Sequence, residues 1–287
     1  MRLKFFNKFG AGLLVLLSLA QVDCSRLRNI NFYSTSEEVN FGKALDKEIR
    51  KQYEILEDER ITGFLQDRGR KLAGVSKRPE IEYHFAAINS EVINAFAIPG
   101  GYCYINLGLI RVSESEAELM SVVAHEISHV VRRHSMKRLS QMQLAGMVTE
   151  IAFGGGSGSV KRTVADLFTT TGLLYYSREA EREADHFGLV NMYESGYDPR
   201  GMVGMFEKLK AHQEGPDPGG WQLLFSTHPV TGERIENARS LTATLPPKKD
   251  LVASTPEWAE ISQYVQEKYP PPKKPEEKEE ETQEEEK

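Results

Sequence analysis

The chain has 287 residues, of which 40% are hydrophobic, and it can therefore bury a sizeable core in one large domain or two small ones. Its formal net charge is −6, and the sequence contains no basic stripe of the kind that nucleic-acid-binding proteins carry, so we expect no nucleic-acid partner. Two cysteines, Cys24 and Cys103, are too few for a disulfide framework, and neither belongs to a cysteine cluster of the zinc-binding type.

The first residues predict export of the chain. A basic start is followed by an apolar run over residues 11–20, which is too short to span a bilayer comfortably. Small residues stand where a signal peptidase would inspect them, which predicts a signal peptide over residues 1–20. An alternative ends the signal at residue 23 and attaches a lipid anchor to Cys24, although the preceding residues fit the lipoprotein pattern poorly. An uncleaved membrane anchor is the third interpretation, and all three place the body outside the cytoplasm.

The segment after the signal predicts helices and then strands. In residues 36–75, Ser36 and the acidic residues behind it indicate a capped start, and apolar residues recur at helical spacing, which predicts two helices. Residues 80–110 change to alternating patterns, which predict a strand, a second strand, a tight turn at residues 99–101 and a third strand.

The second half of the chain predicts helices throughout. Residues 113–140 predict one long helix that begins at Ser113. A Gly-rich break over residues 154–159 follows, and further helices are predicted within residues 163–212. The end of the chain is rich in Pro, Lys and Glu, so we expect a disordered acidic tail over residues 270–287.

The residues from His125 to His129 form a complete His-Glu-x-x-His pattern inside the predicted long helix. Histidines four positions apart lie on one face of a helix, where both can hold one zinc ion. Glu126 beside them can take a proton from a zinc-bound water. The pattern alone also arises by chance on surface helices. Its apolar neighbours favour a buried helix, in which two histidines and a glutamate need a partner such as a metal ion.

A catalytic zinc ion usually takes three protein ligands, so the third must come from another part of the chain. His134 would lie about 140° around a continuous helix from His129, which predicts that it points away from the metal. Glu181 and Asp185 stand four apart on a later predicted helix. The first can ligate zinc, and the second can accept the free N–H of a ligating histidine. The competing interpretation is an ordinary solvated helix rich in Glu and Arg, and the need for a third ligand outweighs it.

Four motifs together resemble those of one known family. They are Asn-Ala-Phe-Ala-x-Pro-Gly-Gly from residue 94, Ala-His-Glu-x-x-His from residue 124, Ser-Arg-x-x-Glu-x-x-Ala-Asp from residue 177 and Thr-His-Pro from residue 227. In this order they are similar to the HtpX- and BepA-like zinc metallopeptidases, which are gluzincins related to the CAAX prenyl proteases. The sequence shows neither the several long apolar helices of some members of this family nor the repeat array of others. It therefore resembles the short, stand-alone secreted type.

The resemblance implies a fold and a metal site. The fold is α+β, a mainly helical, zincin-like metallopeptidase domain with a small antiparallel sheet, over residues 25–269. The site holds one zinc ion, Zn(2+), per chain, through His125, His129 and Glu181, with Glu126 as the general base. Asp185 would accept a hydrogen bond from a ligating histidine without binding the metal itself.

The resemblance also implies residues around the substrate. An edge strand would accept an extended substrate by main-chain pairing, and this strand comprises Asn94, Ala95, Phe96 and Ala97. His228 would face the metal or the substrate, or cap the zinc in a resting form; the alternative is a turn histidine before proline. Arg234 matches a position that is often arginine in this family. His228, Arg234 and Tyr176 are each candidates to stabilise a tetrahedral intermediate.

The function implied by the resemblance is zinc-dependent hydrolysis of peptide bonds in cell-envelope protein quality control. Its substrates would be unfolded or misassembled proteins, and its location periplasmic or outer-membrane-associated. The alternative is a latent or chaperone-like envelope protein that retains the zinc site, which the Gly-rich segment and His228 both allow.

Overall fold

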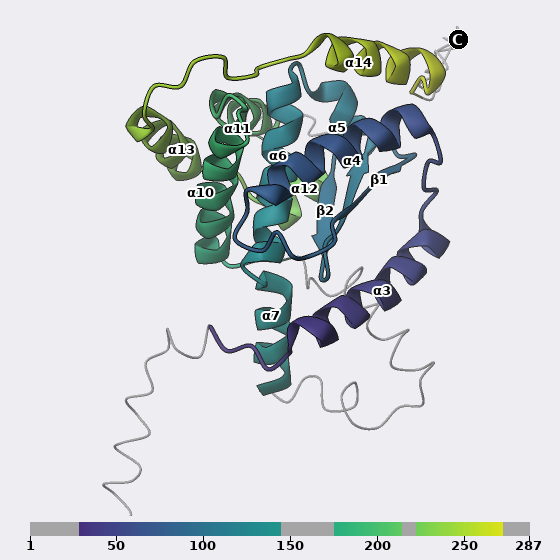
Figure 1. Cartoon of the computed structure of the whole chain (residues 1–287), viewed down its shortest axis with the longest axis vertical. Coiled ribbons are helices and arrows are strands. Elements are labelled where there is room, and N and C mark those ends of the chain that lie inside the picture. Colours follow the sequence, from purple (N-terminus) through teal and green to yellow (C-terminus); the bar gives the residue numbers. More distant parts are fainter. Residues whose placement is uncertain (1–28, 145–174, 214–221, 272–287) are drawn as a thin grey trace, which may run out of the picture.

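The structure is a computed structural model that describes residues 29–144, 175–213 and 222–271 (Figure 1). The predicted signal peptide, Cys24, the Gly-rich segment and most of the predicted tail lie outside the described residues, and these predictions stay untested. None of the helices within the described ranges is both long and apolar enough to cross a membrane.

The described chain is mainly helical, which confirms the predicted α+β class. Its helices are α3 (Thr35–Gln52), α4 (Glu59–Gly74), α5 (Leu107–Val112), α6 (Glu116–Val131), α7 (His134–Leu144), α10 (Arg178–Glu194), α11 (Arg200–Gln213), α12 (Gln222–Thr227), α13 (Gly232–Thr244) and α14 (Pro256–Lys268). Its strands are β1 (His84–Ile88), β2 (Ala95–Ile98) and β3 (Tyr102–Asn106). Ser34, rather than Ser36, caps α3 through a reciprocal pair of hydrogen bonds with Glu37.

The small sheet has the strand order β1-β3-β2. β2 and β3 form an antiparallel hairpin, whose turn contains Gly100 and Gly101 at φ values of 80° and 94°. Glycine adopts such values without the steric penalty that other residues meet. β1, however, is parallel to β3, so the sheet is mixed, and the expected antiparallel pairing holds for only one of its two strand pairs. The cause is topological: the chain reverses between β1 and β2, and the hairpin then inserts β3 between them.

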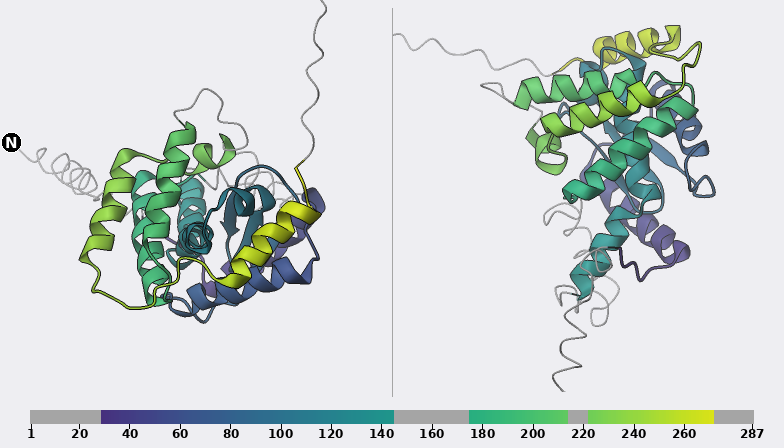
Figure 2. Two further views of the ribbon diagram at one scale, coloured as in Figure 1. Left: turned by 90° about the horizontal axis from the view of Figure 1, so that it is seen from above. Right: turned by 90° about the vertical axis from the view of Figure 1, so that its left-hand side faces the viewer.

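Helix α6, which carries the His-Glu-x-x-His pattern, is the buried centre of the fold. All of its residues are buried. The sheet packs on one side of it and α10 and α11 on another (Figures 1 and 2). Its N-cap is Ser115 rather than Ser113, and the Ser115 hydroxyl accepts a hydrogen bond from the backbone N–H of Glu118. A helix surrounded in this way needs apolar residues on nearly every face, which explains the sequence around the histidines.

The long helix predicted over residues 113–140 is two helices, α6 and α7. Between them, Arg133 has a φ of 57°, in the left-handed region that ends a right-handed helix. The Arg133 Nε lies 2.8 Å from the carboxylate of Glu38, which is buried, and this ion pair holds the bend in place. Because α7 takes a new direction, the position predicted for His134 from a continuous helix does not apply.

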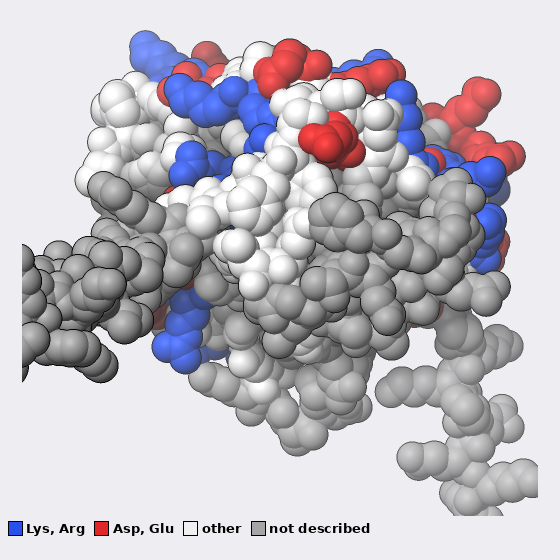
Figure 3. Space-filling view, turned by 90° about the horizontal axis from the view of Figure 1, so that it is seen from below, with Lys and Arg blue, Asp and Glu red and all other residues white. Residues whose placement is uncertain are grey.

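The described surface mixes charges of both signs. In the view of Figure 3, Lys and Arg side chains are interspersed with Asp and Glu side chains around an uncharged area. Some of the charged residues form exposed pairs, such as Arg182 with Glu233 at 2.8 Å. Exposed pairs contribute about 0–1 kcal/mol each, so they have little influence on the fold.

Gly188 permits the close approach of α10 to α6, and we expect Gly188→Ala to destabilise the protein. A Cβ at this position would lie 3.1 Å from the backbone N of His125 and 3.2 Å from the carbonyl carbon of Ala124. Overpacking of this kind costs about 1–3 kcal/mol, which exceeds the gain of about 1 kcal/mol that alanine has over glycine in a helix. Gly63→Ala on α4 is the control, because a Cβ there meets nothing within 4 Å. Urea unfolding should show a lower free energy of unfolding for the first variant only; a stabilised Gly188→Ala would contradict the close packing.

Candidate metal centre

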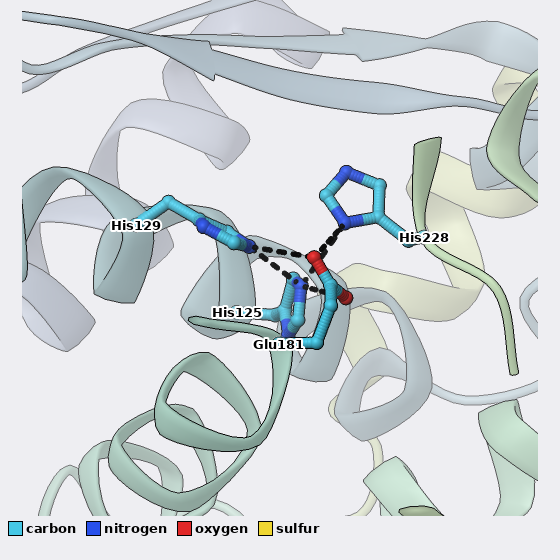
Figure 4. Close-up of side chains that lie close together, drawn as sticks. All are labelled: His125, His129, Glu181 and His228. Carbon is cyan, nitrogen blue, oxygen red and sulfur yellow. Dashed lines mark hydrogen bonds and ion pairs between the residues drawn. The ribbon is translucent and has the colours of Figure 1, made fainter. Parts of the chain in front are cut away.

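Four buried side chains direct their donor atoms to a common point (Figure 4). The Nε2 atoms of His125 and His129 lie 2.9 Å apart. Glu181 places Oε2 at 3.5 Å from Nε2 of His125 and Oε1 at 3.6 Å from Nε2 of His129. Nδ1 of His228 lies 3.0 Å from Oε1 of Glu181 and 3.3 Å from Nε2 of His125. All four ligand atoms lie within 4.8 Å of one another, a spacing that fits the ligands of a single ion.

Segments far apart in the sequence supply these four groups. His125 and His129 lie one turn apart on α6, as the helical spacing predicts. Glu181 lies in the first turn of α10, whose N-cap is Ser177. His228 directly follows α12. The fold thus brings together the three residues predicted as ligands and adds His228, which the sequence analysis left open between a site residue and a turn histidine.

The chemistry of this donor set fits zinc. Two imidazoles and one carboxylate are a frequent ligand set for catalytic zinc, with a fourth position left to water or substrate. In the present arrangement Nδ1 of His228 lies among the other three donors, where it could act as a fourth ligand. Four protein ligands are typical of closed, structural zinc sites. A substrate could therefore reach the position only after the imidazole of His228 moves aside.

Asp185 and Arg234 contact two of the donor groups and orient them. Oδ1 of Asp185 lies 2.9 Å from Nδ1 of His125, which leaves Nε2 of that histidine facing the cluster. Arg234 donates two hydrogen bonds of 2.7 Å to Asp185, and its Nη1 lies 3.0 Å from Oε2 of Glu181. All of these side chains are buried. Arg234 therefore balances the charge of two buried carboxylates and connects them.

Burial and neighbouring charges shift the pKa values of the donors in different directions. Burial would lower the pKa of His125, but its bonds to Asp185 and Glu181 raise the pKa to about 10. Burial, helped by the nearby His125, holds the pKa of His129 well below its ordinary value. Burial would raise the pKa of Glu181, but His228 and His125 hold it well below its ordinary value. Metal binding at His125 therefore competes with a second ring proton, which the two carboxylates favour.

Glu126 lies between the donor cluster and strand β2. Its Oε2 accepts a hydrogen bond of 3.0 Å from the backbone N–H of Ala97. Its Oε1 lies 3.6 Å from Nε2 of His228. Burial raises the pKa of the Glu126 carboxyl, which favours proton uptake. Because Glu126 is not one of the four clustered donors, its carboxylate is available as a base.

Strand β2 is an edge of the described sheet, because it pairs only with β3. The N–H of Ala97 points away from β3 to Glu126, and by alternation the main-chain groups of Ala95 point to the same edge, which pairs with no other described strand. The main-chain groups of Asn94 and Phe96 face β3 instead, and the carbonyl of Asn94 accepts a hydrogen bond from the backbone N–H of Asn106 in β3. Strand β2, which begins at Ala95 rather than at Asn94, is thus an edge of the described sheet beside Glu126.

A narrow pocket with room for about 20 Å³ opens beside His125 and Glu126. Its walls are mostly apolar, and comprise Val122, Phe206, Leu209, Leu224 and Val230. Ser121, His228 and Arg234 complete the lining. The pocket can accept a small part of an apolar side chain next to the donor cluster.

On the side of His129 that faces away from the donor cluster, the structure places His134 differently from the prediction. Nδ1 of His134 lies 2.9 Å from Nδ1 of His129, because the bend at Arg133 turns the side chain back; the orientation predicted from a continuous helix is therefore wrong. His134 remains outside the four clustered donors. The ring of Tyr176 stacks on His129 at 3.8 Å between ring centroids, and its hydroxyl contacts Ser135 at 2.8 Å. The left-handed backbone conformation of Arg133 has no local signature in the sequence, so this arrangement could not be predicted from it.

Known proteins are similar in sequence to most of this chain. The model of Peptidase family M48 matches residues 59–242. The beta-barrel assembly-enhancing protease of Escherichia coli (strain K12) is 30% identical over 220 residues, which are 72% of this chain and 44% of that protein. The putative beta-barrel assembly-enhancing protease of Vibrio cholerae is 28% identical, over 81% of this chain and 50% of that protein. The mitochondrial metalloendopeptidase OMA1 of Schizosaccharomyces pombe is 28% identical, over 79% and 67%. The chain spans about half the length of the two bacterial relatives.

Proposed function

This chain belongs to peptidase family M48, and we propose that it is a zinc-dependent endopeptidase. The observation that carries the proposal is the position of Glu126, beside but outside a buried cluster of three histidines and a glutamate. We assign one zinc ion per chain to His125, His129 and Glu181. Zinc bound there would supply the Lewis-acid chemistry that polarises a scissile carbonyl and makes a water molecule more acidic.

Glu126 acts as the general base in this proposal. The N–H of Ala97 holds Oε2, which leaves Oε1 free to exchange protons on the side of His228. Its raised pKa favours uptake of a proton from the attacking water and delivery of that proton to the leaving amine. The surrounding side chains are buried, so few competing water molecules reach the carboxylate.

The substrate lies as an extended strand along the free edge of β2. Ala95 and the carbonyl of Ala97 offer main-chain groups to it, and pairing of this kind is independent of substrate sequence. The apolar pocket beside His125 then favours an apolar side chain next to the scissile bond. Both features suit unfolded protein chains, which expose backbone and apolar residues together.

His228 is the best placed of the three groups considered for stabilising the tetrahedral intermediate. Its Nε2 lies 3.6 Å from Oε1 of Glu126, close to the reacting end of the base. Arg234 is engaged by Asp185 and Glu181, and the hydroxyl of Tyr176 points to Ser135. We therefore assign His228 to the intermediate, which requires its imidazole to leave the donor cluster but to stay near Glu126.

We further propose that the substrates are unfolded or misassembled cell-envelope proteins. The names of the two bacterial relatives, which are beta-barrel assembly-enhancing proteases, support this choice. The predicted signal peptide supports a periplasmic or outer-membrane-associated location, and a lipid on Cys24 would attach the enzyme to a membrane.

A latent or chaperone-like envelope protein is the second candidate. One observation favours it: His228 stands among the donors and completes a four-ligand set, which leaves no position for a substrate carbonyl. Such a protein would bind zinc and unfolded chains but seldom cut them. The two candidates share the zinc site and differ only in turnover.

Casein, an unfolded protein, tests the proposal and separates the two candidates. We expect the zinc-loaded full chain to cleave casein, a chelator to stop the cleavage, and added Zn²⁺ to restore it. The measurement is the rate of peptide release. A folded, zinc-loaded protein that binds casein without cleaving it would favour the chaperone-like candidate, and chelator-resistant cleavage would contradict the zinc mechanism.

A further inference from the structure

The side of His129 that faces away from the donor cluster carries contacts that the proposed mechanism does not use. Nδ1 of His129 lies 2.9 Å from Nδ1 of His134, and Nε2 of His134 lies 3.1 Å from Oε2 of Glu183. Arg132 donates two hydrogen bonds of 2.9 Å to the Glu183 carboxylate and fixes its orientation. His134 is buried, whereas Glu183 is partly exposed at the other end of these contacts.

The positions of the protons in this series of hydrogen bonds follow from the chemistry of imidazole. A neutral histidine that offers Nε2 to a metal carries its proton on Nδ1. The Nδ1–H of His129 therefore donates to Nδ1 of His134. His134 then carries its own proton on Nε2, where it donates to Glu183. Every acceptor that this sequence of bonds requires is within hydrogen-bond distance.

The other metal-binding histidine has the same arrangement in a shorter form. Asp185 faces Nδ1 of His125 directly, at 2.9 Å. Both histidines thus present Nε2 to the cluster and Nδ1 to an acceptor. We propose that His134, oriented by Glu183, is a positioning residue that fixes the tautomer and ring orientation of His129 for zinc binding. This inference rests on the zinc site of the proposed function.

The bend between α6 and α7 gives His134 this position. Arg133 leaves the helical conformation, and α7 begins with His134, whose side chain returns to the last turn of α6. On a continuous helix, His134 would lie about 140° away from His129. The ring of Tyr176 covers the open face of His129 at 3.8 Å and leaves Nδ1 to His134.

The test compares two substitutions of His134 in the full chain. His134→Phe keeps a ring but removes the acceptor, and we expect it to bind Zn²⁺ about 10- to 100-fold more weakly. His134→Asn offers an amide oxygen near the former Nδ1 and should recover most of this loss. Affinity is measured by competition with a chelator. The visible absorption spectrum of the Co²⁺-loaded protein gives an independent readout of ligand geometry and should shift in the Phe variant only.

A control and a second variant keep the test decisive. His84→Phe replaces a histidine that stacks on Tyr102 away from the cluster, and should keep the parent affinity. If His134→Phe does not fold, Glu183→Ala retains the ring and removes the last acceptor, and we expect about tenfold weaker binding.

Several results would overturn the inference. Parent affinity in folded His134→Phe or in Glu183→Ala would show that the acceptors do not position His129. Equal losses in His134→Phe and His134→Asn would show that His134 acts by packing alone. A parent chain that binds neither Zn²⁺ nor Co²⁺ would refute the proposed zinc site itself, and this outcome is recognised without any variant.

Discussion

Glu126→Gln should keep the metal site and lower turnover by about 10²- to 10⁴-fold, the contribution typical of a general base. The amide oxygen of glutamine can still accept the hydrogen bond from Ala97, so the local geometry is retained. The amide cannot take up the proton of the attacking water. Because Glu126 is outside the four clustered donors, its replacement removes no metal ligand.

Two measurements on the same sample test this expectation. The value of kcat/KM for casein-derived peptides should fall, and the zinc content should match that of the parent. Glu207→Gln on α11, an exposed residue paired with Arg239, is the control and should leave both values unchanged. Full activity in Glu126→Gln would exclude Glu126 as the base. Loss of zinc together with activity would instead make Glu126 part of the metal site.

Arg234→Met should lower the free energy of unfolding by about 3–5 kcal/mol, because it removes the arginine cation from two buried carboxylates. Arg234 donates to Asp185 at 2.7 Å and lies 3.0 Å from Glu181, and its guanidinium also packs over the ring of Phe206. Methionine replaces the packing but not the charge. Bound Zn²⁺ should restore part of the stability, since its charge compensates Glu181.

Urea unfolding of the metal-free and zinc-loaded proteins measures both effects. The control is Arg182→Met, which breaks an exposed pair with Glu233 and should cost about 1 kcal/mol or less. Equal losses in the two arginine variants would contradict the role assigned to Arg234. A large loss that zinc does not reduce would show that the charge of Glu181 is not part of the cause.

The residues that share a helix face were predictable from spacing alone. His125 and His129 stand four apart, and their Nε2 atoms lie 2.9 Å from each other. Glu181 and Asp185 follow the same rule on α10, and both reach the histidines. Periodicity encodes such relations because a helix repeats regularly.

Relations that depend on the backbone between helices were not predictable. The φ of 57° at Arg133 is held by the ion pair with Glu38, a residue nearly a hundred positions away in sequence, and it decides where His134 lies. The parallel pairing of β1 with β3 likewise depends on where the hairpin packs, since the alternation of each strand is the same for either direction. Spacing did not place His228 either, because only the packing of α12 brings it to the cluster; the family resemblance alone indicated that it would face the metal.

The zinc content of the purified full chain, measured beside Glu181→Gln, tests the central claim most directly. Glutamine is close to glutamate in size but is a poor zinc ligand, and Glu181 is the donor that joins α10 to the two histidines of α6. We predict about one zinc ion per parent chain and clearly less in the variant after dialysis. A well-folded parent without zinc, or a variant that retains zinc as firmly as the parent, would contradict a site built from His125, His129 and Glu181.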